Sequence, residues 1–196
     1  MNKSSDNPQE PLRAFVAFDI SVAMRRELTR VQEDLRERLE GDISWVKPEN
    51  IHLSLRFLGT ITPRQVEQAK IILQEVAKIN NRFTVDLGTV NAFPHTHNPR
   101  VIWVGIKTGF NELNQISGQL EEKLSHTGFT SDDRAFYPHL SLARVKQLKN
   151  RATFSSCIDE VTPRFVSTSV ERISLFKSTL QPGGPVYTLL AESPLK

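Results

Sequence analysis

The 196-residue chain has few of the features that mark several large protein classes. It has one cysteine, Cys157, so it can form neither an internal disulfide nor a cysteine-based metal cluster. It has no apolar run near the roughly 20 residues of a membrane-spanning helix, and its polar beginning lacks the apolar stretch of a secretory signal. These absences predict a cytoplasmic protein with no membrane partner.

The chain also carries little net charge. Lys and Arg number 25 and Asp and Glu 22, which gives +3 at pH 7. This balance permits an anionic ligand such as an RNA end, but would not by itself hold a long polynucleotide. Because the sequence contains neither a P-loop nor a G-x-G-x-x-G motif, no nucleotide cofactor is predicted. Composition alone leaves an enzyme, a binding module and a scaffold all open.

The amount of apolar sequence is sufficient for a folded domain. Hydrophobic residues make up 38% of the chain and charged residues 24%, as in ordinary globular proteins. Residues 1–11 are polar and are predicted to be a disordered tail. Residues 12–192 contain no linker rich in Gly or Ser, so we expect one domain there.

Periodicity and capping residues predict a mixed architecture. The expected strands are 12–20, 51–57, 83–87, 100–107, 138–145, a β-rich stretch over 165–180, and 186–190. The expected helices are 21–40, ending before Gly41, then 62–80, which opens with a Thr62–Gln65 capping box, and 110–127. Residues 150–158 fit either a short helix or a loop. This order favours an α+β fold of two lobes packed on one another.

The most informative feature is a repeated tetrapeptide. The sequence His-Leu-Ser-Leu occurs at 52–55 and again at 139–142, both times in a strand-like run. Side chains at i and i+2 of a strand share a face, so each copy presents a His and a Ser together and turns its leucines to the core. Duplication of a structural strand would explain the leucines. It would not explain matching His and Ser side chains on the other face.

Two imidazoles beside two hydroxyls are suited to phosphoester chemistry. His52 or His139, when neutral, can take a proton from water, and the other, when protonated, can give one to a leaving oxygen. Ser54 and Ser141 can donate hydrogen bonds to phosphate oxygens as charge grows on them. This scheme needs no metal.

Neighbouring residues extend the candidate site. By strand parity Arg56 continues the polar face of the first copy, whereas Arg144 is out of phase in the second unless the strand bends there. Phe15 shares a strand face with Arg13 and could stack on a base, but packing in the core is an equal alternative.

The stretches around these motifs resemble a known family. They are 13–17 (RAFVA), 50–59 (NIHLSLRFLG), 99–105 (PRVIWVG) and 137–144 (YPHLSLAR). In this order they are similar to the 2H phosphoesterases, which are named for two His-x-Thr/Ser motifs. The closer likeness is to the branch of RNA 2′,3′-cyclic phosphodiesterases, also called 2′-5′ RNA ligases. The resemblance covers residues 12–190.

The resemblance implies both a fold and a reaction. The fold would be two lobes related by a pseudo-twofold, each with an antiparallel sheet and flanking helices, around a central cleft. The reaction would hydrolyse RNA-terminal 2′,3′-cyclic phosphates to 2′-phosphates, with His52 as general acid and His139 as general base. Ser54, Ser141 and Arg144 would lie at the phosphate. Where many members have Thr, both copies here have Ser, which keeps the hydroxyl.

The resemblance also leaves partners and direction open. The substrate would be an RNA end or a cyclic nucleotide, and nothing in the sequence requires more than a monomer. Members of this family were also detected as 2′-5′ ligases, so joining of tRNA halves is an alternative. A non-catalytic module that binds RNA ends is another, although such a module would not need two histidines.

Other readings of the sequence are weaker. His95 and His97, with the distant His126, could suggest zinc, but no cysteine accompanies them and we expect no metal. A serine nucleophile at either motif would lack the usual G-x-S-x-G turn. Cys157 is expected to be a small packed residue and not a nucleophile.

Overall fold

The computed structural model of the chain describes residues 10–131 and 135–196. The tail expected at residues 1–11 therefore lies almost wholly outside the described residues, and the domain bounds of 12–192 stay a prediction. The strands are β1 (Leu12–Phe18), β2 (Gly41–Trp45), β3 (Leu53–Ile61), β4 (Phe83–Phe93), β5 (Val101–Thr108), β6 (His139–Leu148), β7 (Ser167–Val170), β8 (Arg172–Gln181) and β9 (Gly184–Pro194).

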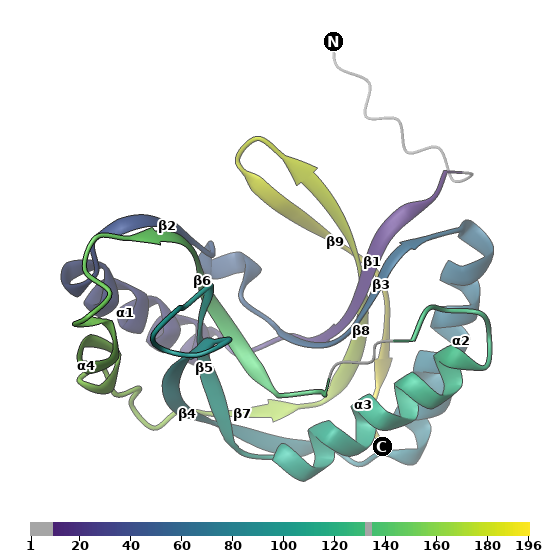
Figure 1. Cartoon of the computed structure of the whole chain (residues 1–196). Coiled ribbons are helices and arrows are strands. Elements are labelled where there is room, and N and C mark those ends of the chain that lie inside the picture. The colour runs from purple at the N-terminus through teal and green to yellow at the C-terminus, as the bar shows by residue number, and fades with distance from the viewer. Residues whose placement is uncertain (1–9, 132–134) are drawn as a thin grey trace.

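The strands form one curled sheet made of two halves (Figure 1). The first half-sheet has the order β3-β1-β8-β9, and the second has the order β7-β4-β5-β6 with β2 paired to β6. Every ladder is antiparallel. The halves meet where Leu53 of β3 pairs with Leu140 of β6. The predicted α+β class with antiparallel sheets is confirmed, and the two lobes share a continuous sheet.

Helices cover the convex face of this sheet. Two of them pack on the half-sheet to which the strand before them does not belong. The helices are α1 (Val22–Arg38), the 3-10 turn η1 (Pro48–Asn50), α2 (Pro63–Ile79), α3 (Phe110–Ser125) and α4 (Phe154–Asp159). Helix α3 follows β5 but packs on β3, whereas α1 follows β1 but donates from Gln32 to the Leu142 carbonyl of β6 at 2.8 Å. This exchange explains why the sequence has no linker between lobes.

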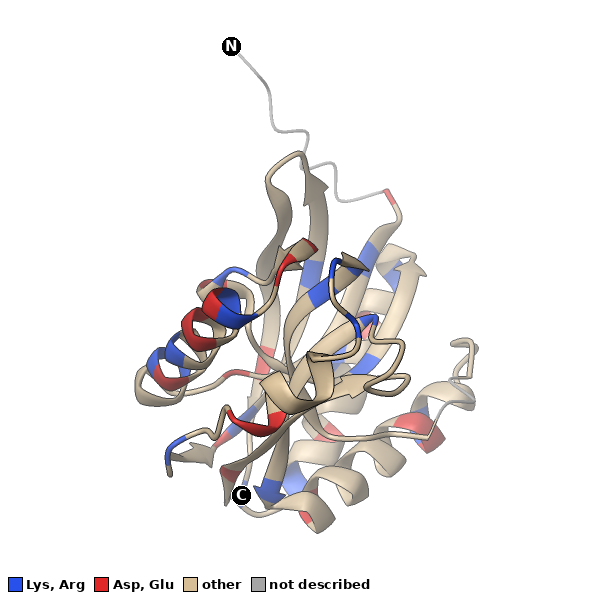
Figure 2. Ribbon diagram, turned by 60° about the vertical axis from the view of Figure 1, so that its left-hand side comes forward, with Lys and Arg blue, Asp and Glu red and all other residues tan. Residues whose placement is uncertain are grey.

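Local sequence accounts for where the helices begin. Ser21 caps α1 by accepting a hydrogen bond from the Met24 N–H at 3.2 Å. Thr62 and Gln65 form the expected capping box, with Pro63 as the first residue of α2. Along α1 acidic and basic residues are interleaved (Figure 2), and Arg30 pairs with Glu27 at 2.6 Å. Arg26, Arg30 and Arg38 therefore belong to a mixed-charge outer face, whereas Arg25 donates to the Pro48 carbonyl oxygen.

Several predicted boundaries differ from the structure. Helix α1 ends at Arg38, and Gly41 begins β2, a strand that the sequence analysis did not predict. A Cβ at Gly41 would lie 2.1 Å from the Gln147 carbonyl oxygen, so this residue serves close pairing with β6 and not only helix termination. Strand β4 runs past residue 87 to Phe93, because pairing with β5 supports a stretch with little apolar pattern.

The C-terminal third also differs in detail. The β-rich stretch predicted over 165–180 divides into β7, at one end of the sheet order, and most of β8, which is next to last at the other end. The undecided stretch at 150–158 contains the short helix α4, whose buried Phe154 and Ile158 anchor it to the core. Strand β9 extends to Pro194.

The main core lies between the helices and the convex face. It includes the leucines of both motifs: Leu53, Leu55, Leu140 and Leu142. Phe15 and Trp103 are also buried but do not belong to this core, because they lie on the concave face. Among the described residues, no helix is long and apolar enough to span a bilayer.

Candidate active site

The two repeated motifs meet at the junction of the half-sheets. Leu53 pairs with Leu140 in the antiparallel register. One residue further along each strand, this register places His52 opposite Ser141, and His139 opposite Ser54. The arrangement has a local twofold axis through the leucine pair. Because the leucines belong to the core, both His-Ser pairs face the concave side.

Backbone hydrogen bonds fix the tautomer of both imidazoles. Nδ1 of His52 lies 2.8 Å from the Asn50 carbonyl oxygen, and Nδ1 of His139 lies 2.7 Å from the Tyr137 carbonyl oxygen. A carbonyl oxygen can only accept, so each Nδ1 carries a hydrogen. Nε2 is then the atom of each ring that can take or give a proton to a ligand.

Aromatic rings surround both histidines. The His52 ring stacks on Phe15, with centroids 4.7 Å apart, and meets the edge of Tyr187 at 5.1 Å. The His139 ring meets Phe93 at 5.0 Å and Trp103 at 5.9 Å. The two sites are built alike, with each imidazole in contact with aromatic side chains of its own half-sheet.

This packing explains the acid–base properties of the imidazoles. Burial lowers the pKa of His52 to about 4, and nearby His139 also disfavours a proton there. Burial likewise lowers the pKa of His139. Both rings are therefore neutral in the free protein at pH 7.

Phe15 supports the imidazole and lies beneath it. Its side chain is only 2% exposed, and its ring contacts His52, Phe57, Phe176 and Tyr187. Of the two alternatives for Phe15, the structure shows packing inside the protein. A nucleobase could not reach its faces in this arrangement.

A bulge in β3 overturns the placement of Arg56. Along β1, Ala17 pairs with Ser54 and Val16 pairs with Arg56, so Leu55 is an extra residue. The extra residue turns Arg56 to the convex face and brings Phe57 to the concave face. Phe57 is 54% exposed. The parity-based prediction that Arg56 lines the site is therefore wrong.

Arg56 instead ties the first half-sheet to its covering helix. It is 6% exposed, forms an ion pair with Glu121 of α3, and donates to the carbonyl oxygens of Phe57 at 2.7 Å and Thr130 at 2.5 Å. Its guanidinium group is bound by these protein partners on the convex side, away from the histidines.

The second motif contains the matching bulge. Trp103 pairs with Ser141 and Ile102 pairs with Ala143, so Leu142 is the extra residue. The bend that the sequence required for Arg144 is present, and its exposed side chain follows Ser141 on the concave face. Its positive charge also acts on the Tyr187 hydroxyl, whose pKa burial raises and Arg144 lowers. Arg144 and Phe57 thus occupy equivalent positions in the two halves.

Known sequences and structures match this architecture over nearly the whole chain. The family described as LigT like phosphoesterase matches residues 18–103 and again 104–187, one match for each motif. The chain belongs to this family. The internal repeat of the phosphoesterase agrees with the local twofold between the motifs.

Individual relatives give the same result. The RNA 2′,3′-cyclic phosphodiesterase of Aquifex aeolicus is 31% identical over 92% of this chain and 96% of its own. The enzyme of the same name from Methanocaldococcus jannaschii is 31% identical over 92% and 99%. A crystal structure from Thermus thermophilus has a TM-score of 0.80 at 24% identity, covering 94% of this chain and 98% of that one. Escherichia coli LigT complexed with 3′-AMP has a TM-score of 0.76 at 23% identity, covering 95% and 99%.

A cavity of about 350 Å³ adjoins His52 in this phosphoesterase. Its aromatic and apolar wall includes Phe176, Tyr187 and Val186, and Lys47 and Asn50 add polar groups. This volume is in the range of small-ligand pockets. Tyr187 was not predicted as a site residue, because no local pattern links the last strand to the first motif.

The remaining sequence candidates lie apart from this arrangement. His95 and His97 are neighbours, with ring centroids 5.0 Å apart, whereas His126 caps the C-terminal end of α3. Across residues 10–131 and 135–196 no three His, Cys, Asp or Glu side chains gather as metal ligands would. Cys157 is partly buried against the core.

The serine hydroxyls are not set up as nucleophiles. In the described part of the chain, neither Ser54 nor Ser141 forms a hydrogen bond to an imidazole, although an activated serine needs one to its base. Both hydroxyls are half-buried on the concave face and are free to donate to a ligand.

Proposed function

We propose that this phosphoesterase hydrolyses 2′,3′-cyclic phosphates at RNA ends to 2′-phosphates, without a metal. The observation that carries the proposal is the paired placement of His52 and His139, each with Nδ1 bound to a backbone carbonyl and Nε2 left for the ligand. Ser54, Ser141 and Arg144 supply hydrogen-bond donors on the same face. These groups match what a phosphoryl transition state requires.

The proposed step moves one proton in and one proton out. Nε2 of neutral His139 takes a proton from water as the water oxygen bonds to phosphorus. The bond from phosphorus to the ribose 3′ oxygen breaks on the opposite side, and Nε2 of protonated His52 gives its proton to that oxygen. The product carries a 2′-phosphate and a free 3′-hydroxyl. Ser54, Ser141 and Arg144 would bind the non-bridging oxygens.

The two half-sheets differ in a way that supports these separate roles. The side of His52 offers exposed Phe57 and the cavity with Tyr187, which suit a base and ribose. The strand of His139 carries Arg144, whose charge reaches Tyr187 and which suits phosphate oxygens. With the nucleoside on the aromatic side, His52 lies near the leaving 3′ oxygen and His139 lies where water would enter.

The low pKa of His52 is compatible with an acid role once substrate is present. Burial holds the imidazole neutral in the free protein and lowers its pKa to about 4. A cyclic phosphate carries a negative charge, and an anion beside Nε2 favours the imidazolium. The substrate thus helps to protonate the group that then acts on it.

Relatives support the choice of substrate. Several are named RNA 2′,3′-cyclic phosphodiesterases, and E. coli LigT has been crystallised with 3′-AMP and with phosphate. We extend the substrate class to this chain because the family model matches it twice, once around each motif. We also propose a cytoplasmic monomer, in line with the sequence.

The first experiment is hydrolysis of a 2′,3′-cyclic mononucleotide and of a short RNA with a cyclic end, both in EDTA. A 2′-phosphate product that forms at the same rate with EDTA would support the metal-free reaction. A 3′-phosphate product would contradict the proposed step. Absence of turnover on both substrates would favour the 2′-5′ ligase or the binding module, which a binding assay with 2′-5′-linked RNA would then separate.

Single substitutions test the two histidines. We expect His52→Ala and His139→Ala each to lower kcat by about 10³-fold or more, since each removes a proton-transfer group, while RNA binding largely persists. His126→Ala is a matched control because His126 is exposed at the end of α3. Full activity in either motif variant would rule out the two-histidine mechanism.

A further inference from the structure

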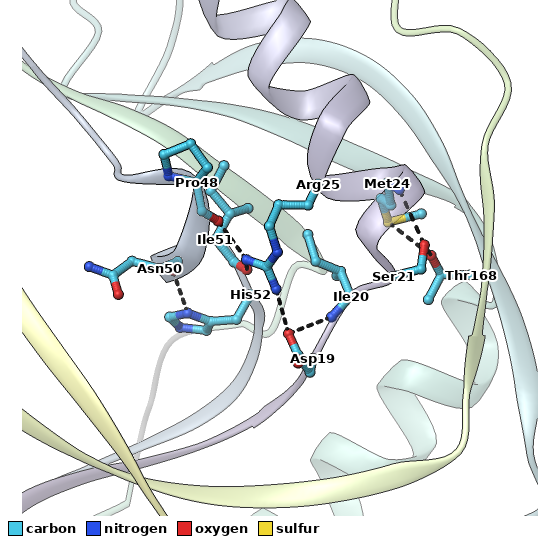
Figure 3. A network of polar contacts seen from close by, with 10 residues as sticks. All are labelled: Asp19, Ile20, Ser21, Met24, Arg25, Pro48, Asn50, Ile51, His52 and Thr168. Atoms are coloured by element: carbon cyan, nitrogen blue, oxygen red, sulfur yellow. Dashed lines mark hydrogen bonds and ion pairs between the residues drawn. The ribbon is translucent and has the colours of Figure 1, made fainter.

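An arginine side chain holds the backbone next to His52. Arg25 of α1 donates from Nη1 to the carbonyl oxygens of Pro48 at 2.5 Å and Ile51 at 3.1 Å. From Nη2 it donates to Asp19 at 2.7 Å. Figure 3 shows the guanidinium between the η1 turn and the end of β1, beside His52.

These contacts hold the chain on both sides of the Asn50 carbonyl, which orients His52. The Asn50 carbonyl oxygen accepts from Nδ1 of His52, and Asn50 lies between the two residues whose carbonyls Arg25 holds. The direction of the Asn50 carbonyl therefore depends on a turn that the guanidinium fixes at both ends. A change in that turn would rotate or release the imidazole.

Arg25 is itself anchored from a distant part of the chain. The first turn of α1 begins at Ser21, whose hydroxyl lies 2.7 Å from that of buried Thr168 in β7. Asp19 accepts a second hydrogen bond from the Ile20 N–H at 2.8 Å. The contacts run from the second half-sheet through α1 to the His52 turn (Figure 3).

His139 lacks this support among the described residues. Its Nδ1 bonds to the Tyr137 carbonyl, as in the first motif. Apart from Arg56 and Lys177, no arginine or lysine of the described chain donates a hydrogen bond to a carbonyl oxygen of residues 135–138. The two motifs have the same letters but different surroundings.

We propose that Arg25 and Asp19 are positioning residues that hold His52 for its role as general acid, a proposal that rests on the proposed function. Arg25 fixes the turn that orients the imidazole. Asp19 fixes Arg25 and offsets its positive charge, so that a cation beside His52 does not expel the proton. The ion pair is one difference between the surroundings of the two motifs in the described residues.

The charges around His52 come from several elements. Asp19 and Arg25 at the β1–α1 junction and Lys47 and Glu49 at the η1 turn line the adjoining cavity, and His139 of β6 lies near His52. The Tyr187 hydroxyl group lies on β9. Of these, Asp19 raises the pKa of His52, whereas Arg25 and His139 lower it, against a larger lowering by burial.

The first part of the test is kinetic. We expect Arg25→Met to lower kcat for a 2′,3′-cyclic mononucleotide about 10- to 100-fold through misplacement of the imidazole, with KM changed less than threefold. Arg25→Lys should recover part of the loss, because it keeps the charge and one donor. Arg26→Met is the control, since Arg26 is exposed on the same helical turn. Equal kcat in Arg25→Met and Arg26→Met would overturn the proposal.

The second part measures His52 without relying on turnover. In ¹⁵N-histidine NMR titrations of the full chain, Asp19→Asn should lower the pKa of His52, whereas Arg25→Met should raise it. The Asp19 side chain is 68% exposed, so this isosteric change should leave the fold intact. Shifts in the same direction, or no shift, would contradict the charge roles. If the wild type showed no hydrolysis while these opposite shifts appeared, the proposed function would fail and the ion pair would still be shown to act on His52.

Discussion

At the scale of single residues, one extra residue in each motif strand decides which side chain reaches the concave face. Leu55 and Leu142 are the fourth letters of the two motifs, and each is a bulge. The bulges bring Phe57 and Arg144 into equivalent places beside the histidines. An aromatic ring on one side and a guanidinium on the other give a symmetric fold an oriented site.

This asymmetry can be tested by comparing two variants. Phe57→Ala should raise KM for a cyclic mononucleotide about 10-fold, because stacking on a base is worth about 1–3 kcal/mol. Arg144→Met should mainly lower kcat, by about 100-fold, because a charged donor acts most strongly on the developing phosphate charge. Steady-state kinetics separates the two effects.

Exposed neighbours serve as controls for that comparison. Phe165 is 82% exposed on the chain before β7, and Lys146 follows Arg144 by two residues on the same strand. Phe165→Ala and Lys146→Met should leave both constants within about twofold. A change in kcat alone for Phe57→Ala would argue against a stacking role.

Arg56 should matter for stability and not for catalysis. Removal of one partner from a buried ion pair leaves the other uncompensated, so Arg56→Met should lower the free energy of unfolding by about 3 kcal/mol. Urea unfolding measures this loss, with exposed Arg64→Met as the control. A large fall in kcat of the folded variant would mean that Arg56 does act at the site.

At the scale of elements, short local signals set where helices begin, and pairing partners set how far strands run. The capping box at Thr62 is complete in the structure, as its letters predict. Strand β2, in contrast, exists because β6 offers an edge to pair with, and its five residues carry no clear pattern of their own.

The capping box allows a stability measurement that is independent of activity. Thr62→Ala should lower the free energy of unfolding by about 1 kcal/mol, since the N-terminal N–H groups of α2 lose an acceptor. Gln65→Ala should cost less, and the double variant should cost less than the sum, because the two side chains bond to each other's residue. Urea unfolding of all three tests this, and strict additivity would contradict a reciprocal box.

At the scale of the whole molecule, the junction of the half-sheets creates the site. Each motif strand alone would carry an exposed His and Ser. Joined at Leu53 and Leu140, the strands bring the two imidazoles together and surround them with aromatic rings of both halves. The same burial lowers the pKa of His52 and His139.

The lowered pKa values predict the pH dependence of the reaction. The reactive form of the free protein holds one proton on the pair formed by His52 and His139. This form is most populated between the two apparent pKa values of the pair, which both lie below 6.5. We therefore expect kcat/KM to be greatest in mildly acidic solution and to fall about tenfold per pH unit above 6.5. A pH series in constant ionic strength checks this, and an optimum above pH 7.5 would contradict it.

The sequence by itself determined the motifs, the class of fold and most element positions. Alternation placed His and Ser of each motif on one face, and capping residues placed α1 and α2, because these features depend on neighbours within a few positions. The spacing of the core residues in each motif strand also indicated the bulges. Leu53, Leu55 and Leu58 are separated by two and then three positions, and so are Leu140, Leu142 and Val145. Strict parity overlooked that change and misplaced Arg56.

Only the tertiary structure decided what surrounds the histidines. Tyr187 and Asp19 are brought to His52 by β9 and by the end of β1, and His139 is brought to it by pairing between two motifs that lie 87 positions apart in the sequence. Desolvation, ion pairing and the opposition of the two imidazoles all depend on distances between segments remote in the chain. Local sequence patterns do not specify such distances, because they arise when the two half-sheets pair.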